Sequence, residues 1–288
     1  MKSSVLFSSA INPKSVLRLY KALGRELPGQ VAIKVHSGEQ GNQNFLKPSF
    51  WKDIVEHTHG NVVECNTAYE GARNTTERHV KLFREHGWSK YFTMDILDGA
   101  GPDLELPVPN GLRIQKNFVG KDIRNYDSIL VLSHFKGHPM GGFGGALKQL
   151  SIGFASSYGK KYIHGAGDAE HPWDTEQTAF LEAMADAASS VVKLFGENAV
   201  YINVMKNLSV DCDCCSIAED PCMQDVGVLI STDPVAIDQA CVDLVYASED
   251  PGKDKMIERI ESRQGLHTLE AAEKLGIGSR EYELIRMD

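Results

Sequence analysis

The segment 132–153 holds the densest group of chemically active side chains in the sequence. Its residues, LSHFKGHPMGGFGGALKQLSIG, include His134, His138 and Lys148. The glycines between these side chains let backbone N–H groups approach a ligand, because no side chain stands in the way. We therefore predict that the segment binds a small anionic ligand or a cofactor along Gly141, Gly142, Gly144 and Gly145.

The elements on either side of this segment favour a binding site. The apolar run 128–132 predicts a buried strand, and 146–150 predicts the first turn of a helix. A strand, a glycine loop and the start of a helix together form a cradle for an anion. Lys148 would oppose the helix macrodipole there, so we expect a lowered pKa and a neutral, nucleophilic amine.

A second reactive group is the cysteine-rich stretch 211–222, which contains four of the 6 cysteines. Thiolates this close in sequence bind soft or borderline metals, or an iron–sulfur cluster. Their spacing matches neither the paired zinc motif nor the ferredoxin motif, so nickel, zinc and iron all stay open. A redox pair or a set of tolerated thiols is the alternative. The predicted metal ligands here are Cys212, Cys214, Cys215 and Cys222.

Other candidates lie at the ends of predicted elements. His134 follows the strand at 128–132 and His164 ends a predicted strand at 161–164, so we expect both to face the cleft, His134 as a candidate metal ligand. Asn66 and Arg73 lie in a polar loop, where they either bind an anionic ligand or shape a turn. Packing is favoured over catalysis for His79, which lies inside a predicted helix.

The order of the predicted elements indicates an α/β fold with a mainly parallel sheet and helices on both faces. No linker divides residues 1–288, so we predict a single domain whose site lies at the carboxyl ends of the strands. Segment 97–120 is expected to form a hairpin or an edge excursion, and 282–287 an edge strand. The predicted strands are 4–8, 31–36, 61–67, 128–132, 161–164, 199–204 and 226–230; the helices are 13–27, 51–58, 75–87, 175–195 and 234–246.

Composition excludes several classes of function. The net charge is −9, from 30 basic and 39 acidic residues, and no basic stripe indicates a nucleic-acid partner. No apolar run approaches the roughly 20 residues of a membrane-spanning helix. The dinucleotide and Walker A fingerprints both fail in the glycine loop. We expect a cytoplasmic protein with reduced cysteines.

Three stretches, 133–153, 163–165 and 225–238, resemble an uncharacterised prokaryotic family whose members are called iron–sulfur centre proteins. The resemblance extends to the D-C-D-C stretch at 211–214. Many members carry a ferredoxin module after the segment equivalent to 161–164. Here the chain runs directly into the predicted long helix, so any cluster would have to use the cysteines of 211–222.

The loop 138–148 is also similar, more distantly, to the H-x4-F-[SG]-G-x2-K loop of the nickel-pincer lactate racemase family. The resemblance implies that His138 is a proton-transfer base and that Lys148 anchors a nicotinate-derived cofactor covalently. A histidine sixteen residues after that lysine binds nickel in the family, which makes His164 the implied metal ligand. The family uses a second catalytic histidine, for which His79 is the candidate.

Three hypotheses of function follow from these patterns. The first is a metal- or metallocofactor-dependent enzyme, a racemase or an oxidoreductase, that acts on a small carboxylic acid by histidine-mediated proton or hydride chemistry. The second is a non-catalytic iron–sulfur or metal-binding protein for electron transfer or cofactor handling. The third is a scaffold that binds a small anion at the glycine loop.

Overall fold

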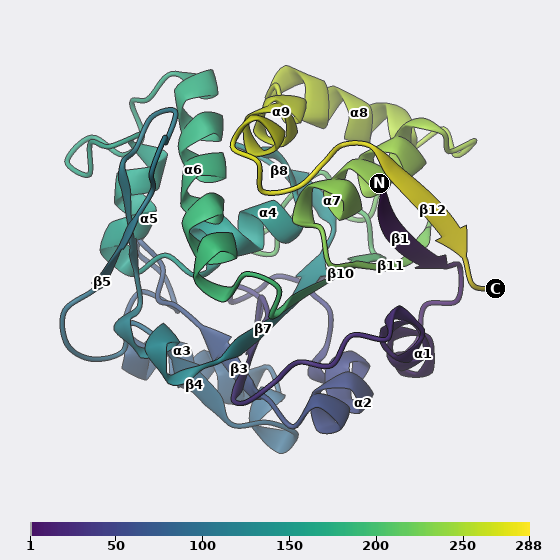
Figure 1. Ribbon diagram of the computed structural model, residues 1–288, viewed down its shortest axis with the longest axis horizontal. Helices are drawn as coiled ribbons and strands as arrows, with labels where there is room; N and C mark the ends of the chain where they lie inside the picture. The colour runs from purple at the N-terminus through teal and green to yellow at the C-terminus, as the bar shows by residue number, and fades with distance from the viewer. Residues whose placement is uncertain (1) are drawn as a thin grey trace.

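A computed structural model describes residues 2–288, which are built around one eight-stranded sheet (Figure 1). The strand order is β12-β1-β11-β10-β7-β2-β3-β4. Strand β11 runs antiparallel to both its neighbours, and every other pair in the sheet is parallel, which confirms the predicted α/β class. The strands are β1 (Ser3–Ser8), β2 (Val31–Lys34), β3 (Asn61–Glu64), β4 (Met94–Ile96), β7 (Ser128–His134), β10 (Ala199–Met205), β11 (Gly227–Ser231) and β12 (Tyr282–Arg286).

Helices cover both faces of the sheet, as predicted (Figure 1). One face carries α1 (Pro13–Leu23), α2 (Pro48–Thr58) and α3 (Thr76–Glu85). The opposite side carries α4 (Ala146–Lys148), α5 (Ser157–His164), α6 (Gln177–Phe195), α7 (Pro234–Tyr246), α8 (Lys253–Ser262) and α9 (Leu266–Lys274). Within residues 2–288, no helix has the length and apolar character needed to cross a membrane.

Strand β7 shows why helices cover both faces of the sheet. All seven of its residues are buried, and successive side chains point to opposite faces. Ile129 and Val131 pack into the core under α4, α6 and α7, whereas Leu130 and Leu132 pack under α1, α2 and α3. A strand that is buried at every position, with an apolar run through its middle, is typical of a parallel sheet with helices on both faces.

Two small antiparallel hairpins lie outside the main sheet. Strands β5 (Leu104–Pro107) and β6 (Lys116–Val119) pair within segment 97–120, which confirms the hairpin expected there. Strands β8 (Lys136–His138) and β9 (Gly142–Gly144) fold the glycine loop back on itself. Strand β12 lies at one edge of the main sheet, also as expected.

The prediction of a strand at 161–164 is wrong, because these residues form the last turn of α5. Ser156 caps this helix by accepting the N–H of Gly159 on its hydroxyl oxygen. Ile163 is fully buried against the α6 side chains Phe180 and Met184. Four residues with one strongly apolar member are too few to distinguish a strand from a helix end by periodicity.

A buried carboxylate, Asp238 on α7, fixes the start of α4. It accepts the backbone N–H groups of Ala146 and Leu147 at 2.7 and 2.9 Å, and the Asn203 amide at 2.7 Å. Gly145 makes room for it, since a Cβ there would lie 2.3 Å from Asp238 Oδ1. Burial raises the pKa of Asp238 to about 6. The anion cradle expected at the glycine loop is therefore filled by the protein's own carboxylate.

Replacing Asp238 with alanine should lower the free energy of unfolding by about 3 kcal/mol, because three buried donors lose their acceptor. Urea unfolding at neutral pH measures the change. Glu249→Ala, at an exposed position just beyond the same helix, is the control and should change stability by less than about 0.5 kcal/mol. Equal effects of the two substitutions would contradict the anchoring role of Asp238.

Candidate metal and ligand site

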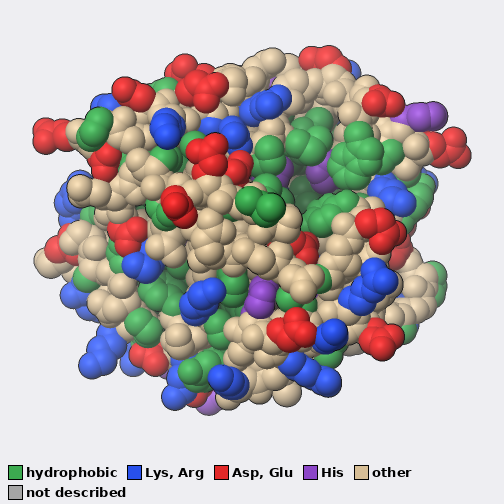
Figure 2. Space-filling model, turned by 180° about the vertical axis from the view of Figure 1, so that it is seen from behind, with side chains coloured by type: hydrophobic (Ala, Val, Ile, Leu, Met, Phe, Trp, Pro, Cys, Tyr) green, Lys and Arg blue, Asp and Glu red, His purple; other side chains and the backbone are tan. Residues whose placement is uncertain are grey.

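A cavity of about 150 Å³ opens at the carboxyl ends of β2 and β3, beside the β8–β9 hairpin. Figure 2 shows a hollow on this surface, with histidine inside it and hydrophobic side chains on its rim. The cavity brings together His138, Lys148 and His164, which are far apart in sequence. Its other charged or reactive lining side chains are Lys34, His36, Glu64, Tyr69, Arg73, Lys136, Lys160 and Cys214.

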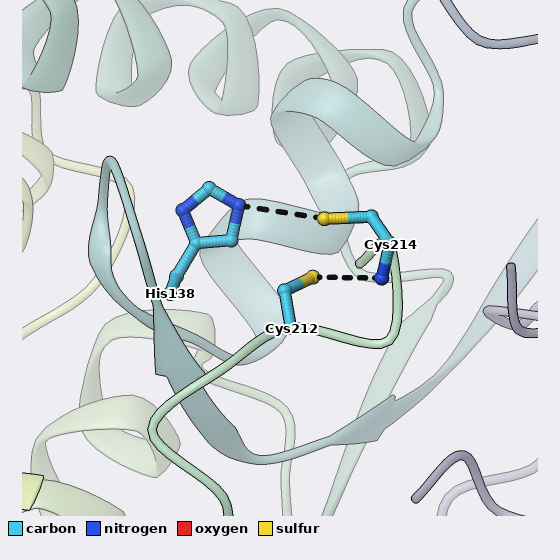
Figure 3. A group of neighbouring side chains, drawn as sticks. All are labelled: His138, Cys212 and Cys214. Carbon is cyan, nitrogen blue, oxygen red and sulfur yellow. Dashed lines mark hydrogen bonds between the residues drawn. The ribbon is translucent and has the colours of Figure 1, made fainter. Parts of the chain in front are cut away.

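Two cysteine sulfurs lie beside the His138 ring at this cavity (Figure 3). The Sγ atoms of Cys212 and Cys214 and a ring nitrogen of His138 all lie within 4.8 Å of one another. His138 Nε2 lies 3.9 Å from the sulfur of Cys214, whose backbone N–H donates to the sulfur of Cys212 at 3.3 Å. Among residues 2–288, this is the group of donor atoms close enough to share one metal ion.

Lys148 is the main positive charge beside Cys212, with its Nζ 3.4 Å from the sulfur. Burial alone would raise the pKa of Cys212, but the Cys214 hydrogen bond and the charges of Lys148 and Lys136 hold it well below its usual value. Burial alone would lower the pKa of Lys148, yet Cys212 and Cys214 raise it. The expected neutral amine is therefore contradicted: Lys148 is an ammonium group paired with a thiolate.

The second cysteine has the opposite tendency. The pKa of Cys214 is raised well above its usual value, first by its hydrogen bonds with Cys212 and Cys215 and then by burial. Cys212 is fully buried, whereas Cys214 is partly exposed and lines the cavity. The pair therefore offers one thiolate and one thiol that loses its proton when a cation binds.

The hydrogen bonds of His138 fix its tautomer. Its Nδ1 accepts the backbone N–H groups of Met140 and Gly141 at 3.2 and 2.8 Å. A nitrogen that accepts hydrogen bonds carries no proton, so the neutral ring carries its proton on Nε2, facing the sulfurs. Burial lowers the pKa of His138 to about 4. This arrangement suits a neutral hydrogen-bond donor and does not suit the proton-transfer base that the sequence predicted.

His164 has the opposite tautomer. Its Nδ1 lies 2.7 Å from the carbonyl oxygen of Lys160, so Nδ1 carries the proton and Nε2 keeps its lone pair. The ring stacks on Phe180 at 4.9 Å, and burial lowers its pKa to about 3. Histidine binds metals as a neutral imidazole in which one ring nitrogen donates to a partner such as a backbone carbonyl and the other carries the lone pair.

The arrangement around His134 differs from the prediction of a metal ligand. Its Nδ1 donates to the carboxylate of Asp213 at 2.9 Å, and its Nε2 bonds to the carbonyl oxygen of Lys206. Lys136 Nζ pairs with the same carboxylate at 3.0 Å. Both ring nitrogens of His134 therefore face acceptors and have no lone pair for a metal. His134 instead hydrogen-bonds to Asp213, which lies between Cys212 and Cys214 in the sequence.

The four predicted cysteine ligands do not gather at one point. Cys222 donates through its sulfur to the carbonyl oxygen of Leu208 at 3.3 Å and packs against the apolar core. Cys215 follows the turn, where its backbone N–H donates to the carbonyl oxygen of Cys212 at 2.9 Å. Within the described part of the chain, neither sulfur joins the donor group of Cys212 and Cys214.

Three further candidates lie under or beside the cavity. His79 is fully buried, its Nδ1 lies 3.3 Å from the side-chain oxygen of Asn66, and neither residue lines the cavity. Arg73 does line it, but its guanidinium group is paired with Glu39 at 3.1 Å and lies 3.9 Å from Glu64. The structure therefore gives His79 and Asn66 internal packing roles and leaves Arg73 a part of the charged wall.

The predicted ligand-binding glycines have separate surroundings. Gly144 and Gly145 line the cavity, and Gly141 donates its N–H to His138. Gly142 has a φ of +78° and lies against the backbone of Gly265, where a Cβ would approach within 2.8 Å. Gly142 therefore serves close backbone packing, whereas Gly144 and Gly145 are part of the cavity wall.

Several lining residues were not among the predicted site residues. Lys34 is buried in β2, where its Nζ pairs with Glu64 at 2.8 Å. Lys160 lies on α5, one turn before His164. A lysine inside an otherwise apolar strand, as in VAIKVH, is the signal that could have identified Lys34.

The model of the family described as "Domain of unknown function (DUF362)" matches residues 31–243. No curated protein matches the chain. Among solved structures, the lactate racemase apoprotein from Thermoanaerobacterium thermosaccharolyticum is similar with a TM-score of 0.46 and 13% identity, over 83% of this chain and 56% of that one. A protein from Thermotoga maritima has a TM-score of 0.40 and 12% identity, over 91% of this chain and 58% of that one. The chain spans little more than half the length of either.

Replacing Lys148 with methionine should raise the pKa of the Cys212 thiol by about 1–3 units, because the nearest positive charge is removed. The ultraviolet absorbance of thiolate against pH measures it, in a Cys215→Ser background because the pKa of Cys215 is also lowered. Lys161→Met, away from the cavity lining, is the matched control and should leave the titration unchanged. Superimposable titrations of all the proteins would contradict the ion pair.

Proposed function

Because the chain belongs to the DUF362 family of unknown function, and its cavity joins two thiols, imidazoles and buried cations, we propose that it is a metal- or metallocofactor-dependent enzyme acting on a small carboxylic acid. The observation that carries the proposal is the pair of cysteine sulfurs, Cys212 and Cys214, which lie within 4.8 Å of each other and of the His138 ring beside the cavity. The loop resemblance at 138–148 supports the same class of chemistry.

The donor set fits a soft or borderline metal ion. In a tetrahedral site with metal–sulfur bonds of about 2.3 Å, two sulfurs lie about 3.8 Å apart, and the sulfurs of Cys212 and Cys214 lie within 4.8 Å of each other. Two thiolates select zinc, nickel or iron over magnesium or calcium. With two ligands from this turn, such an ion keeps open positions toward the cavity, where it would act as a Lewis acid.

The two cavity histidines divide the remaining tasks. His138 directs an N–H toward the sulfurs, so it stabilises negative charge on sulfur or on a substrate oxygen without changing its own protonation state. His164 keeps a free lone pair on Nε2, which suits metal binding, whereas its low pKa makes it a weak base for a substrate proton. The two neutral imidazoles thus offer one hydrogen-bond donor and one acceptor to a bound small molecule.

Positive charge at the cavity supports an anionic substrate. The lining includes Lys34, Arg73, Lys136, Lys148 and Lys160, against one lining carboxylate, Glu64. The carboxylates of Glu39 and Asp213 lie behind this wall and neutralise part of it. Ammonium groups held in a water-poor cavity bind a carboxylate more strongly than they would at the surface.

The main alternative is a non-catalytic iron–sulfur or electron-transfer protein. A cluster with four cysteine ligands would need Cys215 and Cys222 at the same point as the other two thiols. The hydrogen bond of the Cys222 sulfur to Leu208 argues against that arrangement. A visible absorption spectrum separates the two possibilities.

Protein purified without oxygen should contain about one equivalent of zinc, nickel or iron per chain. The Cys212→Ser/Cys214→Ser double variant should contain at least tenfold less metal per chain than the wild type, because both thiolates are removed. Elemental analysis measures the content, and intact mass detects any cofactor attached to Lys148.

Cys222→Ser is the matched control, since its thiol lies in the same loop but outside the donor group. This variant should keep the metal. Metal-free wild-type protein, or equal metal in the wild type and the double variant, would contradict the proposal. Loss of metal with Cys222→Ser would favour the iron–sulfur alternative.

A further inference from the structure

The cavity changes in chemistry from its floor to its mouth. The floor is formed by buried charged and polar side chains, among them Lys34, Glu64 and Lys160. The less buried lining side chains include the apolar residues Ala68, Pro139, Met140, Ile152 and Trp173, together with His36, Tyr69, Lys148 and Cys214. Hydrophobic side chains around the hollow are visible in Figure 2. A site with this gradient fits a molecule that has a charged end and an apolar end.

Lys160 is the cation on the floor that has no ionic partner. Its side chain is 7% exposed, and its Nζ donates to the carbonyl oxygen of Ala155. Lys34 and Lys136 pair with Glu64 and Asp213 at 2.8 and 3.0 Å, whereas no carboxylate of residues 2–288 forms an ion pair with Lys160. Burial lowers the pKa of Lys160, although the charges of Asp98 and Glu64 raise it in part, and an anion in the cavity would further stabilise the ammonium form.

Trp173 provides an aromatic surface on the same wall. Its side chain is 50% exposed and meets the ring of His164 edge-on, with the ring centroids 5.1 Å apart. His164 is bonded through Nδ1 to the carbonyl oxygen of Lys160, so the Lys160 backbone and the Trp173 ring both contact one imidazole. Tryptophan exposed at the mouth of a cavity binds flat apolar groups well.

We propose that the cavity binds a monocarboxylate with an aromatic or other flat apolar tail, the carboxylate on Lys160 and the tail against Trp173. The cavity volume of about 150 Å³ is close to that of a cavity that holds one benzene ring, so the ligand is small. The inference names the substrate class of the proposed enzyme and rests on that function for the reaction, but the binding itself needs no metal.

Isothermal titration calorimetry of the full chain with 3-phenylpropanoate and with propanoate tests the tail, because the two acids share one head group. The phenyl compound should bind at least tenfold more tightly. Trp173→Ala should reduce this preference about tenfold, whereas Tyr158→Ala, equally exposed at 49% but outside the cavity lining, should leave it unchanged. Equal affinity for the two acids, or an unchanged preference in Trp173→Ala, would overturn the proposal.

The head group is tested with Lys160→Met and with 3-phenylpropan-1-ol, which keeps the tail but has no charge. The variant and the alcohol should each weaken binding at least tenfold. The alcohol keeps the test decisive if the variant does not fold, and equal binding of acid and alcohol would overturn the role of Lys160. Metal content separates the two proposals. Wild-type protein that contains metal but does not bind the acid overturns only this inference. Wild-type protein that binds the acid but contains no metal when purified overturns only the proposed metal dependence.

Discussion

The site depends on how charge is balanced around the buried thiolate of Cys212. Lys148 faces its sulfur, and the next residue along, Asp213, is held between His134 and Lys136. Cys212 and Asp213 of the D-C-D-C turn thus pair with two cations of the segment 132–153, Lys148 and Lys136. Removing any one of these charges leaves its partners buried without compensation, so the two segments have to fold as one unit.

Backbone packing holds these two segments in contact. Gly137 in β8 donates its N–H to the carbonyl oxygen of Ser209 at 2.8 Å, and a Cβ at Gly137 would lie 2.3 Å from the carbonyl oxygen of Val210. On the other side, Asp238 fixes the start of α4 and so sets the position of Lys148. The glycine-rich sequence is explained by this close approach of three backbones, and the chemistry is carried by the side chains between them.

Much of the fold could be predicted because strands such as β7 contain an unbroken apolar run, here 129–132, and alternate with capped helices. The convergence of residues 138, 148 and 164 on one cavity also agrees with the expected position at the strand ends. The prediction of a strand at 161–164 was wrong because four residues are too few to show the hydrophobic periodicity of a strand or of a helix. The expectations for Lys148 and His134 failed for another reason: protonation and ligand capacity are set by partners, Cys212 and Asp213, that are distant in sequence.

X-ray absorption spectroscopy at the edge of the bound metal tests the central claim most directly, because it counts the sulfur atoms around the ion. If Cys212 and Cys214 hold the metal and leave positions open to the cavity, the spectrum will show two sulfur neighbours at about 2.3 Å and lighter atoms in the remaining positions. A shell without sulfur, or one with four sulfurs, would contradict this account.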